Sequence, residues 1–109
     1  MKAVFLPGAE EDLKELRRYV IQRFGKNTWS DTYGKIKTSV RSLQAFPLAG
    51  SVPEELADLG LGQYRQVISG MNRIIYEVGN EVLYIHIVCD TRRDMQTLLV
   101  NRLLRMTKK

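Results

Sequence analysis

The feature that most constrains the fold is a run of three closely spaced strand-like segments in the second half of the chain. Gln63–Ile68, Met71–Val78 and Glu81–Cys89 are rich in β-branched and aromatic residues. Only Ser69–Gly70 and Gly79–Asn80 separate them, and a two-residue Gly-Asn link is typical of a tight β-hairpin. The sequence therefore predicts an antiparallel meander of three strands.

Two amphipathic helices are predicted before the meander. The first opens on the acidic Glu10–Asp12 and ends at Gly25, and its apolar residues recur at helical spacing: Leu13, Leu16, Val20 and Phe24. The second follows the cap candidates Asn27 and Thr28, and one apolar stripe runs along it: Trp29, Tyr33, Ile36, Val40, Leu43 and Phe46. Helices joined by so short a link are expected to form an antiparallel hairpin, with the tryptophan in its core.

Three shorter segments complete the predicted order of elements. Ala3–Leu6 is a short apolar strand, Pro53–Leu56 suits one helical turn, and Met95–Met106 carries apolar residues at helical spacing. This order predicts a single α+β domain over residues 1–109, in which the helical hairpin covers one face of a mainly antiparallel sheet. The other face is then open to a partner.

Composition and charge restrict the class of protein without naming a function. Hydrophobic residues make up 44% and charged residues 27%, which are globular proportions, and no apolar run is long enough to cross a membrane. The net charge is +5, and eight basic against four acidic residues lie from Arg65 onward. This permits an anionic partner such as nucleic acid or an acidic protein, although solvated charge explains it as well. The lone Cys89 cannot form an internal disulfide, which fits a cytoplasmic protein.

Arginines interrupt the strand-like region and are candidate functional residues. Alternation along the middle strand places Arg73, Ile75 and Glu77 on one face, which we expect to lie outside the core. A cross-strand salt bridge explains one such arginine. Three more lie on the first strand or just beyond the third: Arg65, Arg92 and Arg93. We expect all four to converge on one part of the sheet, and we expect Arg73, Arg92 and Arg93 to form a cationic cluster at its open end that holds a phosphate or carboxylate by paired hydrogen bonds.

Two residues that often carry chemistry are expected to be structural here. His86 shares a predicted strand face with Tyr84 and Val88, and no partner at ligand spacing accompanies it, so we expect a packed or hydrogen-bonded side chain. Cys89 lies among isoleucines and should behave as a small apolar residue. The chain has no phosphate-binding glycine motif and no nucleophile elbow. The sequence predicts no metal and no cofactor.

The order of these elements and several short motifs resemble the RelE/ParE superfamily of bacterial toxin–antitoxin toxins. The matching motifs are the acid-rich opening of the first helix, the "YR" at Tyr64, "NRIIYEVGNEVLYI" from Asn72, and "DTRRDMQTLLVNRLL" from Asp90. The last of these is nearest to the ParE type. The resemblance implies a compact α+β toxin, chromosomal or plasmid-borne, that is neutralised in the cytoplasm by a cognate antitoxin.

The superfamily divides by mechanism, and the resemblance leaves two targets open. ParE-type members are similar in fold and inhibit DNA gyrase without a nuclease centre. RelE-type members cut mRNA on the ribosome, which requires cationic side chains and acid–base groups around the scissile phosphate. Arg73 matches the family's strand arginine, and Arg65 falls at the first of two RelE-type lysine positions, but the second is Val67. No tyrosine follows Tyr84, which favours the gyrase inhibitor, and Asp90 stands where relatives often carry histidine.

The C-terminal helix predicts where the antitoxin binds. Together with the outer face of the meander it presents more apolar surface than a small monomer usually exposes, so we expect an antitoxin segment to cover part of it. The residues concerned are Met95, Leu98, Leu99 and Leu103, followed by Met106. The antitoxin segment should be net acidic, because it would complement the basic C-terminal part of the chain.

Overall fold

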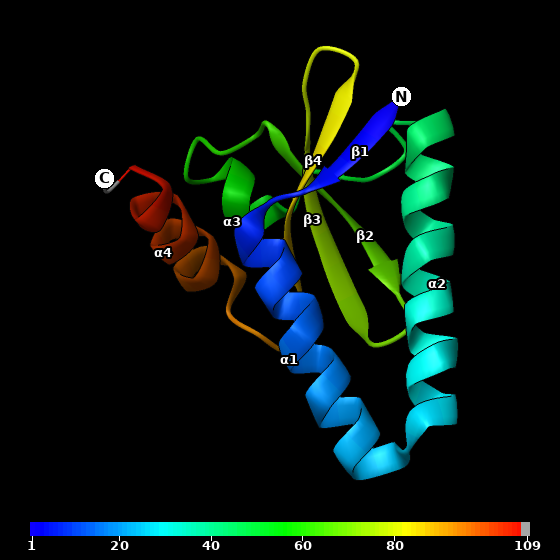
Figure 1. Ribbon diagram of the computed structural model, residues 1–109. Coiled ribbons are helices and arrows are strands. Elements are labelled where there is room, and N and C mark those ends of the chain that lie inside the picture. The colour runs from blue at the N-terminus through cyan, green and yellow to red at the C-terminus, as the bar shows by residue number, and fades with distance from the viewer. Residues whose placement is uncertain (108–109) are drawn as a thin grey trace.

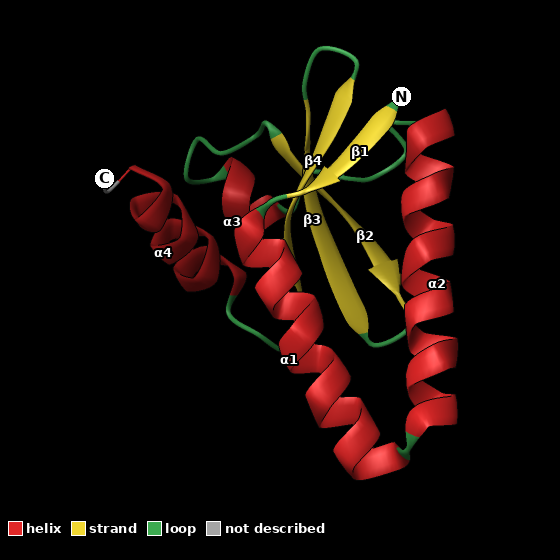
Figure 2. Ribbon diagram, in the orientation of Figure 1, coloured by secondary structure: helices red, strands yellow, loops and turns green. Residues whose placement is uncertain are grey.

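The chain folds into a four-stranded sheet with helices on both faces (Figure 1). The computed structural model describes residues 1–107, with side chains described through Leu103. The elements in order are β1 (Lys2–Phe5), α1 (Pro7–Phe24), α2 (Lys26–Ala45), α3 (Glu54–Ala57), β2 (Tyr64–Ser69), β3 (Asn72–Val78), β4 (Val82–Asp90) and α4 (Met95–Thr107). The strand order is β1-β4-β3-β2, with β1 parallel to β4 and the other pairs antiparallel. The predicted α+β order and the meander are confirmed (Figure 2).

A single glycine connects α1 to α2. Gly25 has a φ of 93°, a conformation that glycine adopts without strain, and its N–H donates to the carbonyl of Ile21 at 3.0 Å. Because α2 begins at Lys26, Asn27 and Thr28 lie inside its first turn and do not cap it, and the Thr28 hydroxyl donates to the Phe24 carbonyl at 3.2 Å. The helical hairpin is confirmed, and Figure 1 shows its tip extending well beyond the sheet.

One face of the sheet packs against the hairpin. The buried residues of this first core are Ala9, Ile36, Val40, Leu43, Ile74, Tyr76, Leu83, Ile85 and Val88. The predicted apolar stripe of the second helix extends beyond the first core at both ends. Phe46, just after α2, is 68% exposed, and Trp29, near the tip, stacks on Tyr33 with ring centroids 5.3 Å apart. The expectation that the tryptophan belongs to the core is therefore wrong.

The opposite face of the sheet is also covered, contrary to the expectation of an open face. α3 and α4 pack on it and bury a second core: Leu56, Tyr64, Ile75, Ile87, Cys89, Met95 and Leu99. Ile75 is fully buried between Arg73 and Glu77. Both charged side chains are partly exposed and pair with neighbours, Arg73 with Glu55 and Glu77 with His86. Charges flanking an apolar residue therefore mark the rim of this face and do not exclude a core beneath it.

A β-bulge in β4 explains why strict alternation misassigns its residues. The register of β4 against β3 shifts at His86, which is an extra residue between Ile85 and Ile87. Ile85 consequently faces the first core, whereas Ile87 faces the second. The predicted common face of His86 and Val88 is wrong for the same reason, because Val88 lies in the first core and His86 pairs with a carboxylate outside it.

Candidate functional site

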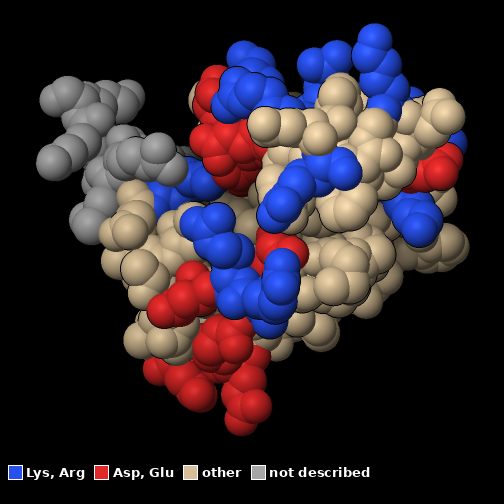
Figure 3. All heavy atoms as spheres, turned by 90° about the horizontal axis from the view of Figure 1, so that it is seen from below, with Lys and Arg blue, Asp and Glu red and all other residues tan. Residues whose placement is uncertain are grey.

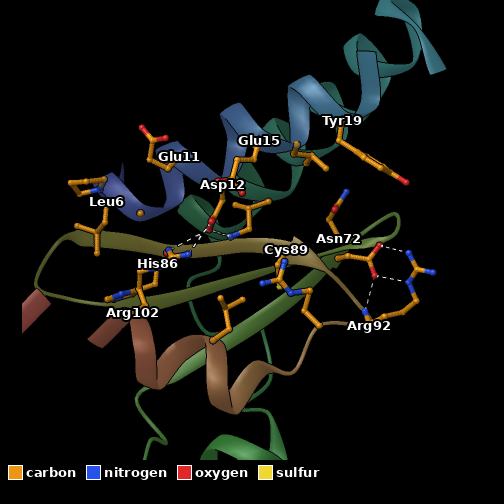
Figure 4. Close-up of a pocket in the computed structure, with 17 residues that line it drawn as sticks. Leu6, Glu11, Asp12, Glu15, Tyr19, Asn72, His86, Cys89, Arg92 and Arg102 are labelled. Atoms are coloured by element: carbon orange, nitrogen blue, oxygen red, sulfur yellow. Dashed lines mark hydrogen bonds and ion pairs between the residues drawn. The ribbon is translucent and has the colours of Figure 1, made fainter. Parts of the chain in front are cut away.

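A groove runs between α1 and the C-terminal end of β4, with α4 on its other side (Figure 4). Its volume is about 950 Å³. The wall from α1 carries Glu11, Asp12, Glu15 and Tyr19, and the facing wall carries Arg92, Arg93, Leu98 and Arg102. Acidic and basic side chains thus meet across one concave surface, which makes the groove the strongest candidate site in the described part of the chain.

The floor of the groove is an edge of β4 that β1 leaves uncovered. β1 pairs with β4 only as far as Ile85, because the chain then turns into α1. Beyond that point two side chains take the place of a neighbouring strand. The Val88 N–H donates to Asp12 Oδ2 at 3.0 Å, and the His86 carbonyl accepts from Arg102 Nη1 at 2.6 Å. The backbone of β4 is therefore tied to both flanking helices.

Asp12 and Arg102 also form a buried ion pair that joins α4 to α1. Arg102 Nη2 lies 2.9 Å from Asp12 Oδ1, and the two side chains are only 7% and 16% exposed. Gly8 leaves room for this pair, since a Cβ there would lie 2.5 Å from Arg102 Nη1. Charge counting does not single out Arg102. The sequence did carry one signal for it, since Arg102 lies three residues after Leu99 and therefore on the apolar stripe of the helix. An arginine at such a buried position is expected to be paired with a carboxylate.

Arg92 is largely exposed at the groove, and Asp90 orients it. Arg92 donates from Nε and Nη2 to the two carboxylate oxygens of Asp90 at 2.9 and 3.1 Å, and from its backbone N–H to Oδ1 at 2.8 Å. These hydrogen bonds hold the pKa of Asp90 below its usual value. Arg93 follows and is exposed as well. The groove therefore carries two accessible guanidinium groups, the first of them held in a defined orientation.

The four predicted arginines do not form one cluster. Arg73 lies on the side of the second core, where its Nη1 donates to Glu55 Oε1 at 2.9 Å and to Gln66 Oε1 at 3.2 Å. Arg65 lies on the opposite face and donates to the Gly50 carbonyl at 2.7 Å. Both side chains are engaged with the protein's own polar groups. Only the other two arginines of the predicted cluster line the groove.

The apolar residues assigned to antitoxin binding lie largely beneath the surface. Met95 and Leu99 are 2% and 0% exposed and belong to the second core. Leu98 lines the groove, and Leu103 is partly buried. Met106 lies outside the residues whose side chains the structure describes. The expectation of a free apolar face is wrong because the stripe of α4 faces the sheet, which leaves Leu98 and Leu103 as the accessible members of the set.

His86 is packed and hydrogen-bonded, as predicted. It is 3% exposed, its Nε2 lies 3.0 Å from Glu77 Oε1, and its ring meets the Tyr64 ring edge-on with centroids 5.0 Å apart. Cys89 is buried, and burial raises the pKa of its thiol to about 11, which outweighs the opposite effect of two nearby arginines. The thiol is therefore protonated at neutral pH and is not an activated nucleophile.

Comparisons with known proteins concern both the sequence and the fold. The family model described as "ParE toxin of type II toxin-antitoxin system, parDE" matches residues 3–95. A search of curated proteins finds no match. Among solved structures the chain is similar to "Chromosomal ParDE TA system from P. aeruginosa", with a TM-score of 0.68, 17% identity, and coverage of 83% of this chain and 95% of that chain. Since the family model covers most of its length, the chain belongs to the ParE toxin family of type II toxin–antitoxin systems.

Proposed function

We propose that this ParE-family toxin inhibits DNA gyrase in the cytoplasm and that a cognate antitoxin neutralises it. Family membership supports a toxin, and the similarity to a solved structure from a ParDE system supports an antitoxin partner. The choice of gyrase rests on the resemblance to the ParE type and on the arrangement of the groove.

The observation that carries the proposal is the exposed arginine pair of the groove. Arg92 and Arg93 follow directly after β4, and the Asp90 carboxylate orients the first of them before any partner arrives. A planar guanidinium held in this way can bind a carboxylate or phosphate by paired hydrogen bonds with less loss of side-chain entropy. Such a pair suits inhibition by binding, because binding requires no acid–base chemistry.

The alternative function, a ribosome-dependent mRNA endonuclease, requires several cationic groups around one phosphate. Arg65 and Arg73 lie on opposite faces of the sheet, and Glu55 already pairs with Arg73. Val67, at the second lysine position of the RelE type, packs against the first core. His86 is buried against Glu77. This arrangement supports the gyrase inhibitor over the nuclease.

Induced expression in bacteria without the antitoxin tests the proposal. We expect growth arrest with induction of the SOS response and trapped gyrase–DNA complexes, because a stabilised cleavage complex leaves broken DNA. Quantifying covalent gyrase–DNA complexes and transcript levels in the same culture separates the two mechanisms. Rapid loss of translated mRNA without trapped gyrase would favour the nuclease, and normal growth would contradict both.

For the antitoxin we propose contact with the accessible side of α4 at Leu98 and Leu103. Leu98 lies on the same wall of the groove as Arg92 and Arg93, so a segment that covers it also meets these two arginines. This segment should be net acidic. Hydrogen exchange of the toxin–antitoxin complex should show protection across α4 and the loop before it. Protection confined to α1 between Leu13 and Phe24 would contradict this placement.

A further inference from the structure

We propose that the basic part of the helical hairpin, from Leu16 onward, is a DNA-binding surface that contacts the phosphate backbone of duplex DNA. This inference does not depend on gyrase as the target. It starts from charge: residues 16–53 contain seven basic residues and one acidic residue, Asp31, whereas the rest of the chain contains ten basic and eleven acidic residues. The segment that forms most of the hairpin therefore has a net charge of +6, whereas the rest of the chain sums to −1 because its acidic parts offset the basic residues from Arg65 onward.

The cations of this segment are exposed and uncompensated. They are Arg17, Arg18, Arg23, Lys26, Lys35, Lys37 and Arg41. Among the described residues, no carboxylate lies within 4.0 Å of their charged nitrogens. Figure 3 views the molecule from the hairpin end and shows Lys and Arg at several places on this face, with groups of Asp and Glu beside some of them. A concentration of unpaired positive charge of this kind attracts a polyanion.

Three of the cations lie along one side of α2. Lys26, Lys37 and Arg41 are spaced by eleven and four residues, which places them on one face of a helix with 3.6 residues per turn. Tyr33 lies between them, and Lys37 Nζ is 4.8 Å from the centroid of its ring. At about 1.5 Å per residue the row is about 22 Å long. Along the axis of duplex DNA this length corresponds to six to seven base-pair steps at about 3.4 Å each.

The surroundings of this row favour DNA over a membrane. The apolar residues of α1 and α2 at the sheet are buried in the first core. The large apolar side chains left exposed on the two helices are Tyr19, Phe24 and Tyr33, which are isolated aromatic residues and not the continuous apolar face that a helix inserts into a bilayer. None of the described helices is long and apolar enough to cross a membrane. Exposed Ser30 and Thr38 flank the cations, and hydroxyl side chains commonly bind phosphate oxygens beside Lys and Arg.

An acidic protein would match the charge but not the chemistry of the surface. Protein interfaces are usually built around an apolar centre with charged residues at the rim. Here Lys37 and Arg41 lie on the exposed face of α2 beside Tyr33, which is 36% exposed and stacks on Trp29, while the more exposed Tyr19 and Phe24 lie on α1 toward the tip of the hairpin. Phosphates on a regular backbone are therefore the better complement.

Fluorescence anisotropy of the full chain with a labelled duplex of about 20 base pairs tests the inference at about 50 mM salt and above. We expect binding that weakens steeply as salt rises. Lys37→Glu combined with Arg41→Glu should weaken it at least about tenfold and reduce the log–log salt slope by about 2. The matched control, Lys2→Glu with Lys14→Glu, changes the net charge equally at exposed sites outside the segment and should retain most of the affinity.

Several outcomes would overturn the inference. They are absence of binding at low salt, an equal loss in the two charge-reversal variants, competition by polyglutamate as effective as competition by unlabelled DNA, and binding to anionic phosphatidylglycerol vesicles but not to DNA. Circular dichroism of each variant shows whether the fold is kept. Because the assay contains no gyrase, its result is separate from the test of the proposed target.

Discussion

Replacing Arg102 with alanine is expected to lower the free energy of unfolding by about 3–5 kcal/mol. The substitution leaves the Asp12 carboxylate, only 16% exposed, without its charged partner. It also removes the donor that lies 2.6 Å from the His86 carbonyl at the uncovered edge of β4. For a domain of this length such a loss corresponds to a fall in Tm of at least about 10 °C. Thermal and urea unfolding, followed by circular dichroism, measure it.

Matched variants separate the ion pair from the loss of side-chain volume. Arg102→Met keeps most of the volume but removes the charge and the donor, so it should destabilise the protein nearly as much as alanine does. Lys14→Ala removes an exposed cation that lies 3.4 Å from Glu11, and it should cost less than about 1 kcal/mol. If Arg102→Met proves as stable as the parent protein, the pair with Asp12 is not what holds α4 against the rest of the fold.

Replacing Arg92 and Arg93 together with alanine is expected to remove most of the toxicity while the fold is kept. Both side chains are exposed, and such substitutions usually change stability by about 0.5 kcal/mol or less each. A hydrogen bond to a charged group contributes about 1.5 kcal/mol or more. Losing one from each arginine therefore weakens target binding roughly a hundredfold. Colony survival after induction and inhibition of gyrase supercoiling by the purified protein measure the effect.

Two further variants show whether geometry or charge matters at this position. Arg92→Lys with Arg93→Lys keeps both charges but loses the planar fork that pairs with Asp90, so an intermediate loss of toxicity is expected. Lys2→Ala with Lys14→Ala removes two exposed cations away from the groove and should leave toxicity unchanged. An Arg92 and Arg93 double-alanine protein that unfolds, or that stays folded and fully toxic, would exclude the pair from the target-binding surface.

The secondary structure was largely predictable because its signals are local. Gly25 ends the first helix, as the sequence indicates, and a tight link joins β3 to β4, although this link runs over 79–81 and includes Glu81 as well as Gly79 and Asn80. Turn chemistry and helical periodicity depend on residues only a few positions apart, so both can be recognised in the sequence without knowledge of the fold. The exposure of Arg92 and Arg93 beyond the last strand followed from the same kind of pattern.

The layers of the fold were not predictable in this way. Alternation along a strand assigns faces only while the register is regular, and the extra residue His86 changes the face of everything after it. The apolar stripe of α4 was visible, but whether it faces solvent or the sheet depends on where the chain turns after Asp90. The structure directs it onto the sheet, and Met95 and Leu99 are buried there.

The positive charge of the hairpin is present in the sequence, but it does not show when charges are summed over the whole first half of the chain. Over the first 64 residues the net charge is only +1, because the acidic Glu10–Glu15 and Glu54–Asp58 offset the basic segment between them. The structure separates these regions in space, since the acidic ends lie at α3 and the start of α1 while the cations lie farther along the hairpin. A charge count per predicted element would have found this surface.

The sequence by itself determined the order of the elements, the helical hairpin, the meander and the arginine pair that follows it. Only the tertiary structure decided which arginines are free. Arg73 meets Glu55 and Arg65 meets the loop at Gly50, whereas Arg102 meets Asp12 from 90 residues away in the chain. The physical reason is that a pattern of neighbouring residues encodes turns and faces, while a buried charge is paired by whichever segment the packing of helices and sheet brings within about 3 Å.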